Sequence, residues 1–180
     1  MTTPLKAGAA GGNSAELREW IAGVDFLPIA LGGTGGTTAA AARSNLGLGL
    51  AALADILGTV SQSGGIPTGA IFQTGSNANG EFIRFASGWQ ICTKTLALST
   101  GATTAVGSIF ASTATSAGAF PASFSQTPIV IPNGTDTRGG GWAAMDIYPT
   151  ATTWGSFSTR HGTSGGVSGT VYLVAVGKWF

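Results

Sequence analysis

A glycine-dense segment near the N-terminus limits the fold of this chain more than any other feature. Four of the five residues from 32 to 36 are glycines. Because glycine has no Cβ, these residues can adopt positive φ angles or lie directly against another backbone, where any side chain would clash. We therefore expect residues 27–65 to form a joint built on Gly32, Gly33, Gly35 and Gly36, ahead of a separate unit over residues 66–180.

A short helix is predicted directly after the glycines. Thr37 or Thr38 can cap an alanine-rich turn over residues 39–43, which Asn45 and Gly47 can end. A helix this short is marginal alone. Its small side chains suit close packing against copies of itself, which predicts an oligomer. A flexible Gly/Ala linker is the alternative.

Apolar helical patterns lie on both sides of this segment. Residues 13–24 combine a capping-box spacing with apolar side chains at helical intervals, namely Leu17, Trp20, Ile21 and Val24. This stripe can pack on the chain's own globular part or against the stripes of other copies on a common axis. Residues 50–57 predict a second brief helix. We interpret residues 1–26 as an N-terminal attachment segment.

Residues 66–180 show strand and turn signals. Residues 70–73 predict a first strand and residues 74–80 a polar loop, followed by a hairpin of residues 81–86 and 89–96. A two-residue turn at Ser87-Gly88 would place Glu81 opposite Lys94. Both faces of this hairpin would then be apolar, with Ile83, Phe85 and Cys92 on one face and Phe82, Trp89 and Ile91 on the other. We expect one face to meet the chain's own core and the other a neighbouring subunit.

Further strands are predicted over residues 106–110, 129–131, 142–148, 153–158 and 170–179. Their spacing by Gly, Pro and Asn is typical of a β-sandwich or jelly roll. Residues 171–176 are apolar at every position, which predicts a central strand covered on both faces.

Charge and cysteine content exclude several classes of protein. Eight basic and seven acidic residues give a net charge of +1, which removes the electrostatic attraction that dominates nucleic-acid affinity. The single cysteine, Cys92, allows no intramolecular disulfide. No apolar run suits a signal peptide or a membrane helix, so we expect synthesis in a cytoplasm and no membrane insertion.

Catalytic and metal-binding patterns are sparse. His161 is the only histidine, so neither a zinc site nor a nucleophile–histidine–carboxylate triad finds its usual partners. The carboxylates beyond residue 65 are Glu81, Asp136 and Asp146, and a glycosidase needs two of them to converge. We predict no cofactor, no metal and no catalysis.

A binding surface is better supported. Residues 133–141 and 159–169 form two long polar loops, and loops on a rigid scaffold often hold binding residues. With adjoining aromatic residues they supply groups suited to sugars, namely Asp136, Arg138, Trp142, Tyr148, Trp154, Arg160 and His161. The alternative is that the two tryptophans are core residues and the loops only connections.

Three motifs resemble one protein family. The run LPIALGGTG at residues 27–35, continued by TTAAAARSNLGLG at residues 37–49, resembles the joint in tail fibres of bacteriophages, prophages and R-type pyocins. GSNANGEFIRFASGWQIC at residues 75–92 is similar to the opening of many fibre C-terminal heads, and AVGKWF at residues 175–180 to their ending. The resemblance implies a mainly β chain, with a short helical or extended fibre-like segment before a jelly-roll-like head, as an intertwined homotrimer.

The resemblance also implies a function. It predicts a fibre tip of a virion, made in the cytoplasm of a bacterial host, that recognises and adsorbs to cells by binding a surface polysaccharide or lipopolysaccharide. The N-terminus would contact other tail or baseplate proteins. Two alternatives stay open, a short capsule-degrading tailspike-type hydrolase and a purely structural fibre or baseplate component.

Overall fold

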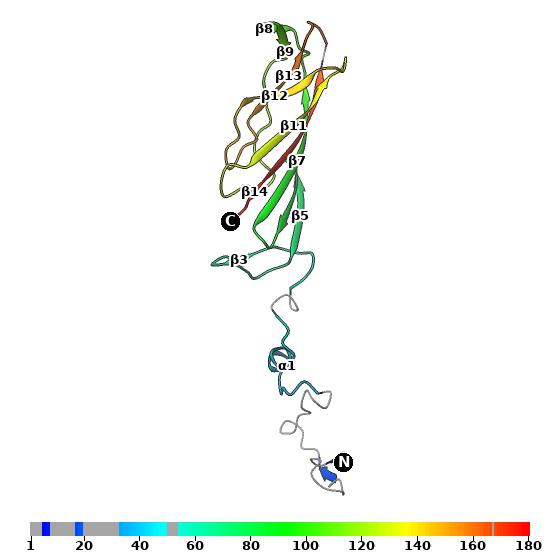
Figure 1. The fold of residues 1–180 in the computed structure, drawn as a ribbon, viewed down its shortest axis with the longest axis vertical. Coiled ribbons are helices and arrows are strands. Elements are labelled where there is room, and N and C mark those ends of the chain that lie inside the picture. The colour runs from blue at the N-terminus through cyan, green and yellow to red at the C-terminus, as the bar shows by residue number, and fades with distance from the viewer. Residues whose placement is uncertain (1–4, 8–16, 20–32, 50–53, 167) are drawn as a thin grey trace. The chain divides into compact units, whose positions relative to one another are not determined.

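The computed structural model describes residues 5–7, 17–19, 33–49, 54–166 and 168–180. The chain divides into two units, residues 1–53 and residues 54–180 (Figure 1). Antiparallel strands supply most of the regular structure, and α1 (Ala39–Asn45) is the one helix among the described residues. The prediction of a mainly β chain is therefore confirmed.

Helix α1 begins at the predicted cap. Thr38 has an extended backbone, and its Oγ1 accepts a hydrogen bond from the Ala41 N–H at 3.1 Å. Beyond the helix, Gly47 has a φ of 68°, the left-handed conformation that glycine favours after a helix end. Before it, Gly35 has a φ of 62°, and a Cβ on Gly36 would lie 2.6 Å from a backbone nitrogen of α1. Both of these joint positions therefore require glycine.

The prediction of a helix over residues 13–24 is wrong at residues 17–19, which the structure describes. Leu17–Glu19 forms strand β2, which pairs antiparallel with β1 (Leu5–Ala7). A short isolated helix has a costly nucleus, whereas β1 offers the backbone of β2 hydrogen-bond partners along its length. The other stripe residues, Trp20, Ile21 and Val24, lie outside the described residues, as does Gly32.

The second predicted helix, over residues 50–57, is also absent at residues 54–57, the part that the structure describes. Residues 50–53 lie outside the described part of the chain, and residues 54–57 are not helical. Leu57 instead forms a parallel bridge to Phe72. This pairing holds the start of the second unit to its first long strand.

The main sheet of residues 54–180 has five antiparallel strands in the order β11-β14-β7-β6-β5. They are β11 (Ile129–Asp136), β14 (Gly169–Lys178), β7 (Trp89–Leu98), β6 (Gly80–Phe85) and β5 (Phe72–Asn77). We call this the β14 sheet. The apolar final strand lies between β11 and β7, so its central position is confirmed. The loop predicted over residues 74–80 is instead strand as far as Asn77.

A second sheet is organised around β13 (Ser156–His161), and we call it the β13 sheet. On one side β13 pairs with β12, and on the other with β10 and β9. Strand β9 pairs in turn with β8, and β8, β9, β12 and β13 are labelled close together in Figure 1. These strands are β12 (Trp142–Ile147), β10 (Thr115–Ser116), β9 (Ile109–Ala111) and β8 (Thr104–Val106). A small ribbon of β3 (Gln62–Ser63) and β4 (Ile66–Pro67) precedes the β14 sheet.

The core takes side chains from both sheets. The β14 sheet contributes Cys92, Leu96, Leu98, Val171, Leu173 and Ala175, and the β13 sheet contributes Phe157. Ala117, Phe120, Phe124 and Trp154 complete it from the connecting segments. Phe120 lies against Trp154 with ring centroids 4.5 Å apart. The jelly-roll topology and the intertwined trimer stay predictions.

The β6–β7 hairpin differs from its prediction by one residue. The turn has three residues, 86–88, and Gly88 has a φ of 88° while its N–H donates to the Phe85 carbonyl at 3.0 Å. Glu81 consequently pairs with Thr93. Lys94 donates to the Ala117 carbonyl at 2.7 Å, so the expected Glu81–Lys94 pair does not form.

This shift of one residue changes the partners on each face of the hairpin, because side chains alternate along a strand. Phe82 is opposite Cys92, and Ile83 is opposite Ile91. The core face therefore carries Phe82 with Cys92, and the other face carries Ile83 with Ile91. Both faces are apolar as predicted, but with exchanged members.

Candidate functional site

The outer face of the β14 sheet, which points away from the core, carries a partly exposed row of apolar side chains. Four directly paired residues cross it in one row, namely Ile129, Val176, Ile91 and Ile83. The next rows add Ile131 at 57% exposure, Val174 at 37% and Tyr172 at 58%, while Ile129 itself is 71% exposed. A contiguous exposed apolar patch usually marks an interaction site. A single chain thus covers only one face of β14, whereas the sequence predicts cover on both.

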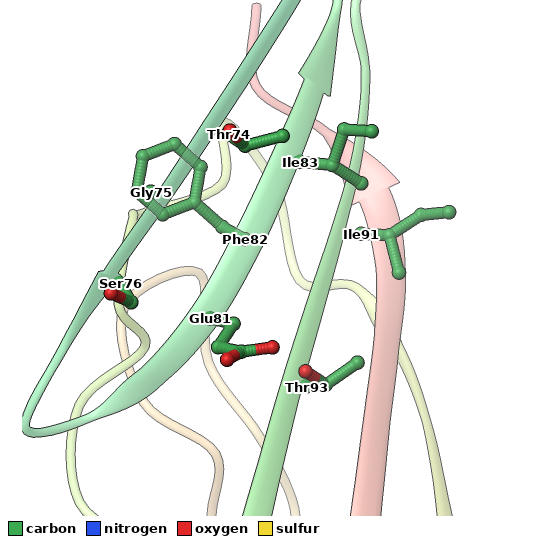
Figure 2. Close-up of a pocket in the computed structure, with 8 residues that line it drawn as sticks. All are labelled: Thr74, Gly75, Ser76, Glu81, Phe82, Ile83, Ile91 and Thr93. Carbon is green, nitrogen blue, oxygen red and sulfur yellow. The ribbon is translucent and has the colours of Figure 1, made fainter.

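A pocket of about 450 Å³ opens on β5, β6 and β7, at one end of the apolar row. Ile83 lies beside Ile91, and Glu81 lies near Thr93 (Figure 2). Glu81 is the one charged residue among those that line the pocket. The Phe82 ring lies against Gly75, where a Cβ would come within 2.5 Å of ring atoms. Glycine at position 75 therefore makes room for this ring.

The second and third family-like motifs contact each other. Trp179 Nε1 donates to the Phe85 carbonyl at 3.0 Å, and Lys178 Nζ donates to the Ser87 carbonyl at 3.1 Å. Lys178 also lies 4.7 Å from the centre of the Trp89 ring, a favourable cation–π distance. The C-terminal residues therefore hold the β6–β7 turn in place, which gives both motifs a structural role.

A polar network beside this hairpin is internal. Arg84 Nε donates to Gln90 Oε1 at 2.6 Å, and Gln90 Nε2 donates to the Ala122 carbonyl at 2.7 Å. Burial lowers the pKa of Arg84. Burial also raises the pKa of the adjacent Cys92 thiol to about 11. Cys92 is thus an inert core residue, because only the thiolate is nucleophilic.

Three of the predicted site residues meet at the ends of β11 and β13. Asp136 is 4% exposed and accepts hydrogen bonds from the Arg138 backbone N–H at 3.0 Å, from Nε at 3.1 Å and from Nη2 at 2.5 Å. These bonds to Arg138 hold the pKa of Asp136 below its usual value. Arg138 Nη1 also donates to the Thr163 carbonyl at 2.9 Å. We call this group, with His161, the tip clasp.

His161 completes the tip clasp from β13. Its Nδ1 accepts a hydrogen bond from the Thr163 N–H at 3.0 Å, so in the neutral ring Nε2 carries the proton and donates to the Gly139 carbonyl at 3.1 Å. Gly139 and Gly140 both have φ near 70°, which lets the chain fold back tightly toward this ring. The clasp therefore binds the two polar loops to each other, and its polar groups are largely used within the protein.

Arg160 and Trp142 lie together on the outer face of the β13 sheet. They are directly opposite each other in the β12–β13 pair. Trp142 is 48% exposed, and Arg160 Nη2 donates to Asp146 Oδ1 at 2.5 Å. Both charged side chains are 19% exposed. We call Trp142, Asp146 and Arg160 the β12–β13 patch.

Asp146 is a candidate that sequence reasoning did not select. It sits between Met145 and Ile147, where the β12–β13 register shifts. Asp146 is four residues beyond Trp142, so strand alternation alone places its carboxylate on the face that carries Trp142 and Arg160. The bulge leaves Asp146 as the extra residue without a cross-strand partner. The sequence did contain a signal for Asp146, because it is the one carboxylate in the otherwise apolar run of residues 142–147.

The two remaining candidates, Tyr148 and Trp154, differ in their exposure to solvent. Tyr148 follows β12 and is 84% exposed. Trp154 is fully buried and packs in the core, so its prediction as a receptor-binding residue is wrong. Because its indole fills the space beside Phe120, it cannot reach a ligand.

Among the described residues, no group of three His, Cys, Asp or Glu side chains is placed to hold a metal ion. No helix in the described ranges is both long enough and apolar enough to cross a membrane.

No protein-family model and no curated protein matches the sequence. The solved structures similar to this chain are pyocin tail fibres. A C-terminal fragment of the Pseudomonas aeruginosa R1 pyocin fibre has a TM-score of 0.46 and 18% identity, over 96% of this chain and 41% of that chain. The corresponding R2 fragment has a TM-score of 0.40 and 17% identity, over 95% of this chain and 38% of that chain. An N-truncated R1-type fibre has a TM-score of 0.42 and 16% identity, over 79% of this chain and 98% of that chain. The chain thus spans less than half the length of the first two fragments.

Proposed function

We propose that this chain is the C-terminal region of a phage-type tail fibre that adsorbs to a bacterial host by binding a surface glycan without catalysis. The three sequence motifs support this assignment, since together they follow the order of joint, head opening and ending in that family. In this proposal residues 1–26 attach to other tail or baseplate proteins in the virion, residues 27–65 form the joint, and residues 66–180 form the receptor-binding head.

The observation that carries the proposal is the exposed apolar outer face of the β14 sheet. Isoleucine and valine side chains cross four paired strands in one row, and Ile131, Val174 and Tyr172 extend the apolar surface along β11 and β14. Contact of such a surface with water is unfavourable. In a homotrimer this face would be buried against other copies. The joint glycines support the same assembly, because Gly35 has a φ of 62° and a Cβ on Gly36 would lie 2.6 Å from a backbone nitrogen of α1, so neither position suits a side chain.

Binding is favoured over hydrolysis by where the carboxylates lie. Asp136 is buried in the tip clasp, and Asp146 is paired with Arg160 on the β13 sheet. Glu81 belongs to the β14 sheet. Hydrolysis of a glycosidic bond needs two carboxyl groups on opposite sides of one bond, and these three stand in different environments on different elements.

The test combines assembly with adsorption. Sedimentation equilibrium of the full chain is expected to give a trimer at micromolar concentration, and the labelled protein is expected to adsorb to cells of at least one bacterial strain in a panel. Incubation with polysaccharide from the adsorbing strain should release no new reducing ends. A monomer would overturn the assembly, absence of adsorption across the panel would overturn the receptor role, and new reducing ends would establish the hydrolase alternative.

A further inference from the structure

The two arginines of the polar loops differ in how many of their donors the protein uses. Arg138 engages Nε, Nη1 and Nη2 with Asp136 and Thr163. Arg160 makes one hydrogen bond within the described residues, from Nη2 to Asp146. A guanidinium has five N–H donors in a fixed fork. The Arg160 side chain is 19% exposed, and its remaining donors have no partner among the described residues. Arg138 has few donors left to offer a ligand.

The carboxylates differ in the same way. Both oxygens of Asp136 accept hydrogen bonds from Arg138. Asp146 uses Oδ1 for Arg160, and its Oδ2 accepts no hydrogen bond from the described residues. The β12–β13 patch thus combines open donors and an open acceptor, which the tip clasp lacks.

An aromatic surface stands directly beside these groups. Trp142 is the cross-strand neighbour of Arg160, and opposite residues in an antiparallel pair have Cβ atoms roughly 5 Å apart. The negative face of an indole ring attracts the slightly positive C–H groups on one side of a sugar ring. Three residues of β12 lie between Trp142 and Asp146, about 13 Å along a strand. Arg160 spans this interval, because it is opposite Trp142 and its guanidinium bonds to Asp146.

We infer that the β12–β13 patch is the glycan site of the proposed fibre head, and that it takes a neutral pyranose with adjacent hydroxyl groups. The sugar would stack on Trp142, one hydroxyl would accept from Arg160, and a neighbouring hydroxyl would donate to Asp146. The Arg160–Asp146 pair carries no net charge, which suits a neutral sugar better than an anionic one. This inference rests on the proposed function, and it moves the binding role away from Arg138 and His161.

The probe is a microarray of bacterial surface polysaccharides, with neutral and anionic repeating units printed beside periodate-oxidised copies of each. Periodate cleaves the bond between carbons that carry adjacent hydroxyls, so it destroys the feature that the inference requires. We expect the full chain to bind at least one neutral polysaccharide and to lose that signal on the oxidised copy. Trp142→Ala and Arg160→Ala should each weaken the apparent Kd by about 5-fold to 150-fold, the equivalent of losing 1–3 kcal/mol.

Arg138→Ala is the matched control, because it removes the same side chain from the tip clasp. It should leave the Kd within twofold at 20 °C, with circular dichroism melts confirming that each variant is folded at that temperature. Trp142→Phe keeps an aromatic ring, so it should bind more tightly than Trp142→Ala even if both lower the melting temperature.

The outcomes separate the inference from the function on which it rests. If the unsubstituted chain binds and the Trp142 and Arg160 variants bind equally well, the site lies elsewhere and the fibre function stands. Binding restricted to anionic polysaccharides, or kept after periodate, would overturn the class of sugar. If the unsubstituted chain binds no polysaccharide and adsorbs to no cells, both the proposed function and this inference are wrong.

Discussion

Replacing Arg138 by alanine tests whether the tip clasp is structural. The Asp136 side chain is 1% exposed and that of Arg138 is 26% exposed, so Arg138→Ala leaves a buried carboxylate without its guanidinium. Removing one partner of a buried pair costs about 3–5 kcal/mol. We expect the lower end, about 3 kcal/mol, because Asp136 keeps the hydrogen bond from the backbone N–H of residue 138 and Arg138 is only partly buried. For a unit the size of residues 54–180, this lowers Tm by roughly 10 °C.

The pH dependence supplies an independent check. In the native chain Arg138 depresses the pKa of Asp136, so the clasp's contribution to the unfolding free energy is present at neutral pH. That contribution falls as the pH drops below about 4 toward the depressed pKa. In Arg138→Ala, burial without a partner should raise the pKa of Asp136, which makes the folded variant less stable as the pH rises. The difference in stability between the two proteins should therefore shrink from pH 7 to pH 3.5.

The assay is urea unfolding followed by circular dichroism, at one protein concentration because assembly makes stability concentration-dependent. The control is the double variant Asp136→Asn/Arg138→Ala, in which no buried charge lacks a partner. It should recover at least half of the lost stability. A loss below about 0.5 kcal/mol in Arg138→Ala, the usual scale of a surface substitution, would show that the clasp is not structural. A double variant no more stable than the single one would show that the loss does not come from the unpaired carboxylate.

Three further outcomes are expected. Val174→Lys places an ammonium group on the outer face of the β14 sheet, where burial without a partner costs several kcal/mol, so sedimentation should give monomers. The control variant Val106→Lys, at a similarly exposed position of the β13 sheet, should stay trimeric. If both variants dissociate, the outer face of the β14 sheet has no special role in assembly. Gly35→Val should reduce trimer yield, because Gly35 has a φ of 62° that a β-branched residue disfavours. The control is Thr34→Val, and an equal, normal yield from both variants would mean that the segment is only a linker. Burial raises the thiol pKa of Cys92 to about 11, so iodoacetamide at pH 8 should leave it unmodified until urea is added; rapid labelling of the native protein would contradict its place in the core.

Local signals in the sequence predicted local structure well. Thr38 and Gly47 mark the two ends of α1 because caps depend on neighbouring backbone groups alone. The apolar run of β14 correctly predicted a central strand, although within one chain only one of its two faces is covered. The helix over residues 13–24 failed where β1 supplies a partner for residues 17–19, and pairing with a distant segment is not visible in a local pattern.

The hairpin register shows where sequence reasoning ends. Ser87-Gly88 suits a two-residue turn, but Gly88 at positive φ suits the third position of a three-residue turn equally well. The choice depends on which side chains meet the core, and here Cys92 is buried in the core and its cross-strand neighbour Phe82 packs against it. One residue of register therefore decides which isoleucines form the outer face.

The sequence could not tell which candidate side chains the fold buries or pairs. Arg138 and Arg160 lie in similar polar contexts, and their partners distinguish a closed clasp from an open patch. Arg138 binds the nearby Asp136 and the distant Thr163, whereas Arg160 binds Asp146 on the neighbouring strand. Trp142 and Trp154 likewise differ in exposure, 48% against 0%, although both follow small or polar residues. Burial and pairing of this kind arise from the whole fold, so composition could name the residue types but not the members of the site.

The two surfaces also fit one another in the proposed trimer. The core lies between the two sheets, so the outer face of the β14 sheet and the β12–β13 patch point away from each other across it. Burying the first surface against other copies would leave the second in solvent on every subunit. A single neutral sugar bound by one tryptophan and one ion pair gives modest affinity, whereas linked sites that engage together can raise avidity by about 10²–10⁴ without any new contact. Trimer formation through the β14 sheet would thus make a weak site on the β13 sheet sufficient for adsorption, and a monomeric variant such as Val174→Lys should bind immobilised polysaccharide more weakly than the trimer even though its β12–β13 patch is unchanged.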